Sequence, residues 1–180
     1  VELKPQSTHF TNSEFDSSDV SEYTLDNSAS VDSSDADTTL KSHDYINHDA
    51  DSTNFGGGTV TAPFRRKTVS GDFDIYARFK VGTHANFHSF MLTAQSTSTS
   101  TDHVGMHVIH NSGVIVRFRT ENNGVNSDTD LSAPAGTLAL GEFIFLLIKR
   151  SGNDFSGYWS YDGKTFTQLG ATTARTDFSA

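Results

Sequence analysis

The sequence contains no cysteine, and this absence excludes several kinds of chemistry. Without thiols the chain cannot form disulfide bonds, hold a metal through thiolates or use a thiol nucleophile. A membrane-spanning run of about 18 apolar residues is also absent. The apolar stretch "FIFLLI" (143–148) covers only six positions, and residues 1–10 do not resemble an export signal. We therefore expect no membrane insertion.

Basic residues are few as well. The chain has 13 Lys and Arg against 22 Asp and Glu, which gives a formal net charge of −9 at pH 7. Nucleic-acid phosphates attract clustered Lys and Arg, so this balance argues against a nucleic-acid partner. Residues 12–54 carry eleven of the acidic residues and one lysine, whereas residues 55–180 are almost neutral. The first third is therefore predicted to contain acidic loops.

Phenylalanine is abundant, at 14 residues against 2 methionines, and this favours a core of rigid aromatic and β-branched side chains. The length of 180 residues suits one domain over 1–180, in which residues 1–10 form an arm or linker. Because the chain begins with Val1, we expect a processed piece of a longer protein.

Strand patterns dominate from residue 56 onward. Residues 72–81, "DFDIYARFKV", alternate strictly between apolar and polar side chains, which is typical of a half-buried strand. Residues 103–110 and 114–119 are predicted to form a hairpin around "NSG", and residues 143–148 a central strand. The shorter stretches "TTLKS" (38–42) and "DYINH" (44–48) are expected to be edge strands. Frequent turn signals and little helical periodicity predict an antiparallel sandwich or barrel.

The stretch 153–170 contains the single tryptophan and reads as a second hairpin. Asp162-Gly163 lies between its two strands and favours a type I′ turn. Trp159 and Tyr161 share one face of their strand, where they could stack on a sugar ring. The alternative is that Trp159 or Tyr158 packs into the core.

The segment 56–170 resembles the concanavalin A-like lectin/glucanase superfamily, specifically its laminarinase-like and laminin-G-like jelly rolls. The residues that carry the resemblance are Lys149, Arg150, Gly152, Asn153, Phe155, Tyr158, Ser160, Asp162, Gly163, Phe166, Leu169 and Gly170. The resemblance implies an all-β, antiparallel two-sheet jelly-roll sandwich. Only ten residues follow Gly170, so the family's C-terminal strands are expected to be missing, and the open sheet edge would recruit a partner.

Glucanases of this superfamily carry an acidic Glu-x-Asp-x-Glu strand, which this sequence lacks. The nearest matches are carboxylate pairs without a third member, most of them in expected loops: Asp35 with Asp37, Asp49 with Asp51, Asp72 with Asp74, and Asp128 with Asp130. The chain is therefore not expected to be an enzyme.

Polar side chains on the non-core faces of two strands form a candidate binding surface for hydroxyls or acidic sugars. Its members are Arg78, Arg117, Arg119, Tyr76 and His107. The alternative is a solvated face, with the arginines paired to Asp72 and Asp74.

Two groups of residues are candidate metal ligands. His103, His107 and His110 are spaced by four and three residues, but on a strand residues four apart lie about 13 Å from each other, so a shared transition metal is not expected. Calcium is a weak candidate at Asp35, Asp37, Asp49 and Asp51, against the alternative of solvated acidic loops.

The leading hypothesis is a non-catalytic glycan-recognition or adhesion module of a larger secreted, cell-surface or virion-surface protein. One alternative is a structural assembly domain that contacts identical or neighbouring subunits in a virion, fibre or surface layer. A second alternative is a degenerate glycoside hydrolase.

Overall fold

The structure is a computed structural model that describes residues 24–26, 39–41, 45–47, 64–66, 68–80, 89–96, 102–110, 114–132 and 142–178. The chain divides into two compact units, Val1–Val69 and Ser70–Ala180. All regular elements among the described residues are β-strands. The described part of the chain has no helix long and apolar enough to cross a membrane. The assignment of residues 1–180 to one domain stays a prediction.

The first unit contains two small antiparallel sheets. Strand β1 (Thr24–Asp26) pairs with β4 (Phe64–Arg66), and β2 (Thr39–Lys41) pairs with β3 (Tyr45–Asn47). Strands β2 and β3 lie within the stretches 38–42 and 44–48 that were predicted to be strands. They pair with each other rather than with the edge of a larger sheet.

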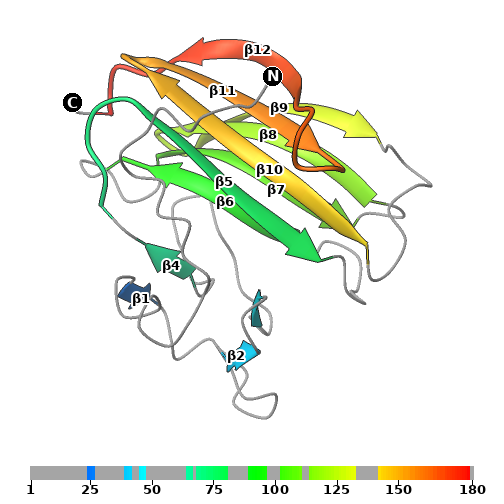
Figure 1. Cartoon of the computed structure of the whole chain (residues 1–180). Coiled ribbons are helices and arrows are strands. Elements are labelled where there is room, and N and C mark those ends of the chain that lie inside the picture. Colours follow the sequence, from blue (N-terminus) through cyan, green and yellow to red (C-terminus); the bar gives the residue numbers. More distant parts are fainter. Residues whose placement is uncertain are drawn as a thin grey trace. The chain divides into compact units, whose positions relative to one another are not determined.

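The second unit contains two antiparallel sheets of four strands each (Figure 1). The β10 sheet has the order β12-β11-β10-β5, and the β8 sheet has the order β6-β7-β8-β9. The strand bounds are β5 Phe73–Lys80, β6 Ser89–Gln95, β7 His103–His110, β8 Val114–Asn122, β9 Val125–Ser132, β10 Phe143–Ser151, β11 Asp154–Ser160 and β12 Thr167–Ala174. In this unit the predicted all-β, antiparallel two-sheet arrangement is confirmed, and the jelly-roll topology of the concanavalin A-like type stays a prediction.

The alternating and apolar stretches of the sequence lie where the pattern predicts. The strictly alternating segment is β5, and "FIFLLI" begins β10, which lies between β5 and β11. The predicted hairpin of residues 103–110 and 114–119 is the β7–β8 pair, with Met106 opposite Phe118. Each of these strands forms because one pleat face carries the apolar side chains that leave water on folding.

The core lies between the two sheets. Val104, Met106 and Val116 come from the β8 sheet and are fully buried, as are Ile144, Leu146, Ile148 and Phe155 of the β10 sheet. Gly157 of β11 marks a close approach of the sheets, because a Cβ atom there would lie 2.3 Å from Met106 Sδ and 2.4 Å from Phe118 Cδ2. Phe73 of β5 is buried, while Ile75 and Phe79 on the same face are half-buried.

The connection between β11 and β12 differs from the sequence prediction. Trp159 of β11 is opposite Thr167 of β12, so residues 161–166 form a longer loop, and only Gly163 in it has a positive φ. The type I′ turn predicted at Asp162-Gly163 is therefore wrong. Asn123-Gly124 has that geometry, with φ of 50° and 76°, and joins β8 to β9. In the longer loop the Asp162 carboxylate instead accepts the backbone N–H groups of residues 164 and 165.

The residues that follow β12 connect the two sheets. The Arg175 backbone N–H donates to Asn153 O at 2.8 Å in the turn between β10 and β11, and Arg175 Nη1 donates to His103 O at 3.1 Å on the β8 sheet. The Phe178 ring is buried 4.7 Å from that of Phe155, measured between centroids, and Arg150 Nη2 donates to the Phe178 carbonyl. This contact set, residues 175–178, is called the C-terminal clasp. That the family's C-terminal strands are missing after Gly170 stays a prediction. The last described strand, β12, extends beyond Gly170 to Ala174.

Candidate functional site

The outward face of the β8 sheet carries Arg117 and Arg119, two of the three arginines that the sequence singled out. On β7 and β8 the inward residues alternate with outward ones, so Val104 and Met106 face the core while His103 and His107 face outward. Directly opposite residues in an antiparallel pair share a face, so His107 lies beside Arg117. The outward face therefore runs from the histidines of β7, through the arginines of β8, to the aspartates of β9.

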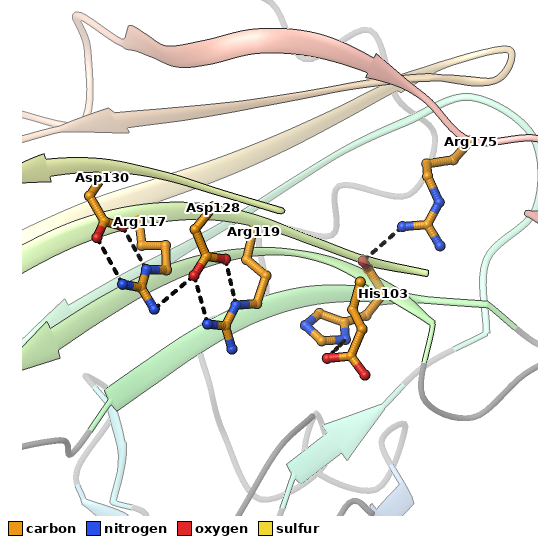
Figure 2. Close-up of polar contacts among 7 residues, drawn as sticks. His103, Arg117, Arg119, Asp128, Asp130 and Arg175 are labelled. Carbon is orange, nitrogen blue, oxygen red and sulfur yellow. Dashed lines mark hydrogen bonds and ion pairs between the residues drawn. The ribbon is translucent and has the colours of Figure 1, made fainter. Parts of the chain in front are cut away.

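The central feature of this face is a set of four side chains, Arg117, Arg119, Asp128 and Asp130, called here the Arg–Asp ladder (Figure 2). Arg117 Nε and Nη2 donate to Asp130 Oδ1 and Oδ2 at 2.6 and 2.8 Å. Arg119 makes the same bidentate contact with Asp128, at 2.7 and 2.8 Å. Arg117 Nη1 also lies 3.0 Å from Asp128 Oδ2, which joins the two pairs.

Cross-strand pairing explains why these residues meet. Arg117 is opposite Asp130 and Arg119 is opposite Asp128 in the β8–β9 register, which the Asn123-Gly124 turn fixes. Bidentate guanidinium–carboxylate contacts are planar and restrict both side chains. The ladder is therefore a preorganised array of hydrogen-bonding groups on a sheet face.

The ladder is half-exposed. The exposed fractions of the side chains are 21% for Arg117, 18% for Arg119, 26% for Asp128 and 35% for Asp130, so a ligand from solvent can reach them. The hydrogen bonds from Arg119 lower the pKa of Asp128, and the hydrogen bond to Asp130 raises the pKa of Arg117. Both shifts favour the charged forms of Asp128 and Arg117.

The β7 side of the same face is buried. His103 and His107 stack with ring centroids 6.3 Å apart, much closer than the 13 Å that the strand spacing predicted. The cause is Gly105 between them, since a Cβ atom there would lie 2.7 Å from His107 Nε2. Burial, together with Arg119 and His103, lowers the pKa of His107 well below its usual value, and His107 Nε2 has no hydrogen-bond partner in the described part of the chain. Glu121 is fully buried and lies 4.0 Å from His103 Nδ1.

Two other predicted site residues lie on the opposite side of the second unit. Tyr76 and Arg78 are on the outward face of the β10 sheet, and Arg78 Cζ lies 4.6 Å from the centre of the Phe143 ring. The structure thus brings together Arg117, Arg119 and His107 and separates them from Tyr76 and Arg78.

The acidic partners proposed for the arginines are engaged elsewhere. Asp74 pairs with Lys149 Nζ at 2.7 Å, and Asp72 accepts the backbone N–H of Gly152. The two arginines of β8 therefore pair with the aspartates of β9 rather than with Asp72 and Asp74.

Trp159 lies on the core-facing side of β11, opposite Leu146, and is half-buried. Its ring meets that of Tyr161 edge to face, with centroids 5.1 Å apart, and Tyr161 is 39% exposed. Trp159 Nε1 is buried and has no hydrogen-bond partner among the described residues. The pair is thus separate from the Arg–Asp ladder, and its role in ligand stacking stays a prediction.

Metal ligands do not gather in the part of the chain that the structure describes, where no group of three or more His, Cys, Asp or Glu residues could hold an ion. The weak calcium candidates Asp35, Asp37, Asp49 and Asp51 lie outside the described residues.

With this geometry established, the chain was compared with known proteins. No family model and no curated protein matches it. Among solved structures it is similar to the GH43 protein BlXynB from Bacillus licheniformis, with a TM-score of 0.50 and 15% identity. The likeness is one of fold. It covers 63% of this chain and 20% of BlXynB, so the chain spans about a fifth of that protein.

The aspartates of the ladder are functional candidates that the sequence reasoning missed. Asp128 and Asp130 were noted as a carboxylate pair but not as partners of the arginines, because β9 has few apolar residues and was not predicted to be a strand. The Asn123-Gly124 dipeptide is the sequence signal that would have found these partners. Asn-Gly favours a two-residue hairpin turn, and counting outward from Asn123-Gly124 places Arg119 opposite Asp128 and Arg117 opposite Asp130.

Proposed function

We propose that this chain is a non-catalytic glycan-recognition module with a jelly roll of the concanavalin A-like type. In this proposal it belongs to a larger secreted or surface-exposed protein, and the ligand lies on the Arg–Asp ladder. The similarity to part of a GH43 glycoside hydrolase agrees with a role near glycans, although a fold likeness alone does not bring that protein's chemistry to this chain.

The observation that carries the proposal is the joined pair of bidentate contacts among Arg117, Arg119, Asp128 and Asp130. Sugar hydroxyls both donate and accept hydrogen bonds, so a site for them needs fixed donors and fixed acceptors side by side. Guanidinium groups supply the donors and carboxylates the acceptors. Because each group is already held by its partner, little side-chain freedom is lost when a ligand binds.

The same contacts argue against a general-acid role for Asp128. Glycoside hydrolysis requires a carboxylic acid that is protonated near neutral pH, hence a raised pKa. The hydrogen bonds from Arg119 lower the pKa of Asp128, which is the opposite direction. Asp130 accepts two hydrogen bonds from Arg117, one on each carboxylate oxygen, so both of its oxygens are engaged by the guanidinium group.

A glycan array with the wild-type chain and two variants tests the proposal. Arg119→Lys keeps the charge but cannot make the bidentate contact, so it should weaken binding about tenfold or more. The matched control is Asp74→Asn, which disrupts the Lys149–Asp74 ion pair on the outward face of the other sheet. We expect the control to bind like the wild type. If the wild type bound no glycan, or if both variants bound equally well, the proposal would be wrong.

A second candidate function, subunit assembly, is favoured by strand β9. Within the described residues β9 pairs with β8 alone, and Val125 at its start is 72% exposed. An open strand edge can pair with a strand of another subunit. Sedimentation of the chain at several concentrations tests this candidate: a stable oligomer that Val125→Lys dissociates would support it, and a monomer throughout would exclude self-assembly through β9.

A further inference from the structure

The Arg–Asp ladder carries no net charge. Its two guanidinium groups are matched by two carboxylates, and His107, the buried histidine next to Arg117, is held neutral by its burial at physiological pH. An anionic ligand would find no unpaired positive charge on the ladder, and each carboxylate would repel it at short range. The arrangement therefore disfavours uronate, sulfate and phosphate groups.

After its internal contacts the ladder keeps both hydrogen-bond donors and hydrogen-bond acceptors for a ligand. Two guanidinium groups have about ten N–H donors and two carboxylates have about eight lone-pair positions. Four hydrogen bonds within the ladder use four of each, and the 3.0 Å contact between Arg117 Nη1 and Asp128 takes part of what is left. Donors and acceptors thus remain in comparable numbers, and both are half-exposed.

Among ligand groups, the hydroxyl fits this inventory because it donates and accepts. An anionic group offers acceptors only, so it would satisfy the guanidinium donors but leave the carboxylate lone pairs desolvated and unpaired, which is costly. From this balance we propose that the Arg–Asp ladder selects uncharged, polyhydroxylated glycans over acidic ones. The inference rests on the proposed glycan-recognition function and adds the ligand class.

The inference also assigns Asp130 a specificity role. Asp130 neutralises Arg117 and is the most exposed member of the ladder. Its replacement by Asn would leave the ladder with a net positive charge while keeping nearly the same side-chain volume. We expect Asp130→Asn to lose affinity for neutral glycans and to gain affinity for acidic ones.

The experiment measures the binding of neutral oligosaccharides and of uronate-containing oligosaccharides of equal length by calorimetry, at about 0.02 and 0.3 M salt, where screening differs strongly. The wild type should bind the neutral series at least about tenfold more tightly than the acidic series, with little dependence on salt. Asp130→Asn should reverse this preference at low salt and lose the acidic binding at high salt. Asp74→Asn, the matched carboxylate on the other sheet, should leave both series unchanged.

The binding results distinguish a failure of the selectivity for neutral glycans from a failure of glycan recognition itself. Binding of acidic glycans by the wild type, tighter and salt-sensitive, would overturn the inference while leaving glycan recognition intact. Binding of neither series would overturn both. The wild-type comparison requires no variant, so it decides the matter even if Asp130→Asn does not fold.

Discussion

Replacement of Gly157 by alanine tests how the two sheets face each other. The added methyl group would lie 2.3 Å from Met106 Sδ and 2.4 Å from Phe118 Cδ2, more than 1 Å inside an ordinary van der Waals contact of about 3.5–4 Å. Both neighbours are buried in the facing sheet, so neither can move into solvent. Overpacking of this kind costs about 1–3 kcal/mol, and with two neighbours displaced we expect about 3 kcal/mol.

Equilibrium unfolding in urea measures this loss directly as a lower midpoint at an unchanged m-value. The matched control is Ser156→Ala, because residue 156 precedes Gly157 on β11 and its side chain points to the outward face. That control removes the 3.3 Å hydrogen bond from Ser156 Oγ to the Tyr158 hydroxyl and should cost only about 1 kcal/mol.

A double-mutant cycle identifies the cause of the loss. If the clash with Met106 is responsible, Gly157→Ala should cost clearly less in a Met106→Ala background, where the sulfur is absent. A Gly157→Ala variant as stable as the wild type, or a cost that does not depend on Met106, would refute the packing described here.

Three further predictions concern single side chains. Burial lowers the pKa of His107, so below about pH 6.5 the unfolded chain takes up a proton that the folded chain does not. The free energy of unfolding should therefore fall with decreasing pH, by up to about 1.4 kcal/mol per pH unit. Urea unfolding from pH 7 to 5 measures this slope, and His107→Gln should flatten it. The backbone N–H groups of Thr165 and Lys164, with the Ser160 hydroxyl, lower the pKa of Asp162 to about 2, and an NMR titration that gave an unshifted value would contradict this loop geometry. Phe178→Ala should destabilise the fold by about 3 kcal/mol because the ring is buried in the C-terminal clasp, and an unchanged urea midpoint would show that the clasp does not stabilise the fold.

Strands with one apolar face could be predicted from the sequence, because burial of that face decides both their conformation and their orientation. Strand β5 is an example, with Phe73, Ile75, Ala77 and Phe79 on one side and charged or polar groups on the other. The long apolar run of β10 likewise indicated a strand with neighbours on both sides.

Strand β9 could not be predicted from its own composition. Its sequence "VNSDTDLS" is rich in residues that isolated strands disfavour. Pairing to β8 stabilises it, through the Asn123-Gly124 turn and the two arginine contacts, so a tertiary interaction overrides the local preference. The arginines were recognised from the sequence, but their true partners depended on this pairing.

The histidine spacing shows a different limit. Backbone rise alone puts His103 and His107 about 13 Å apart, and that estimate assumes side chains perpendicular to the strand. With no side chain at Gly105, the His107 ring leans along the strand to within 6.3 Å of the His103 ring. Glycine between two large residues on one strand face is the sequence signal that would have predicted the stacking.

The most direct test of the central claim is NMR chemical-shift mapping of the wild-type chain with a neutral oligosaccharide. The side-chain Nε–H signals of Arg117 and Arg119 and the backbone amides of Asp128 and Asp130 should shift, while Tyr76 on the outward face of the other sheet should not. Shifts centred on Tyr76, or no shifts at all at millimolar ligand, would contradict the assignment of a glycan site to the Arg–Asp ladder.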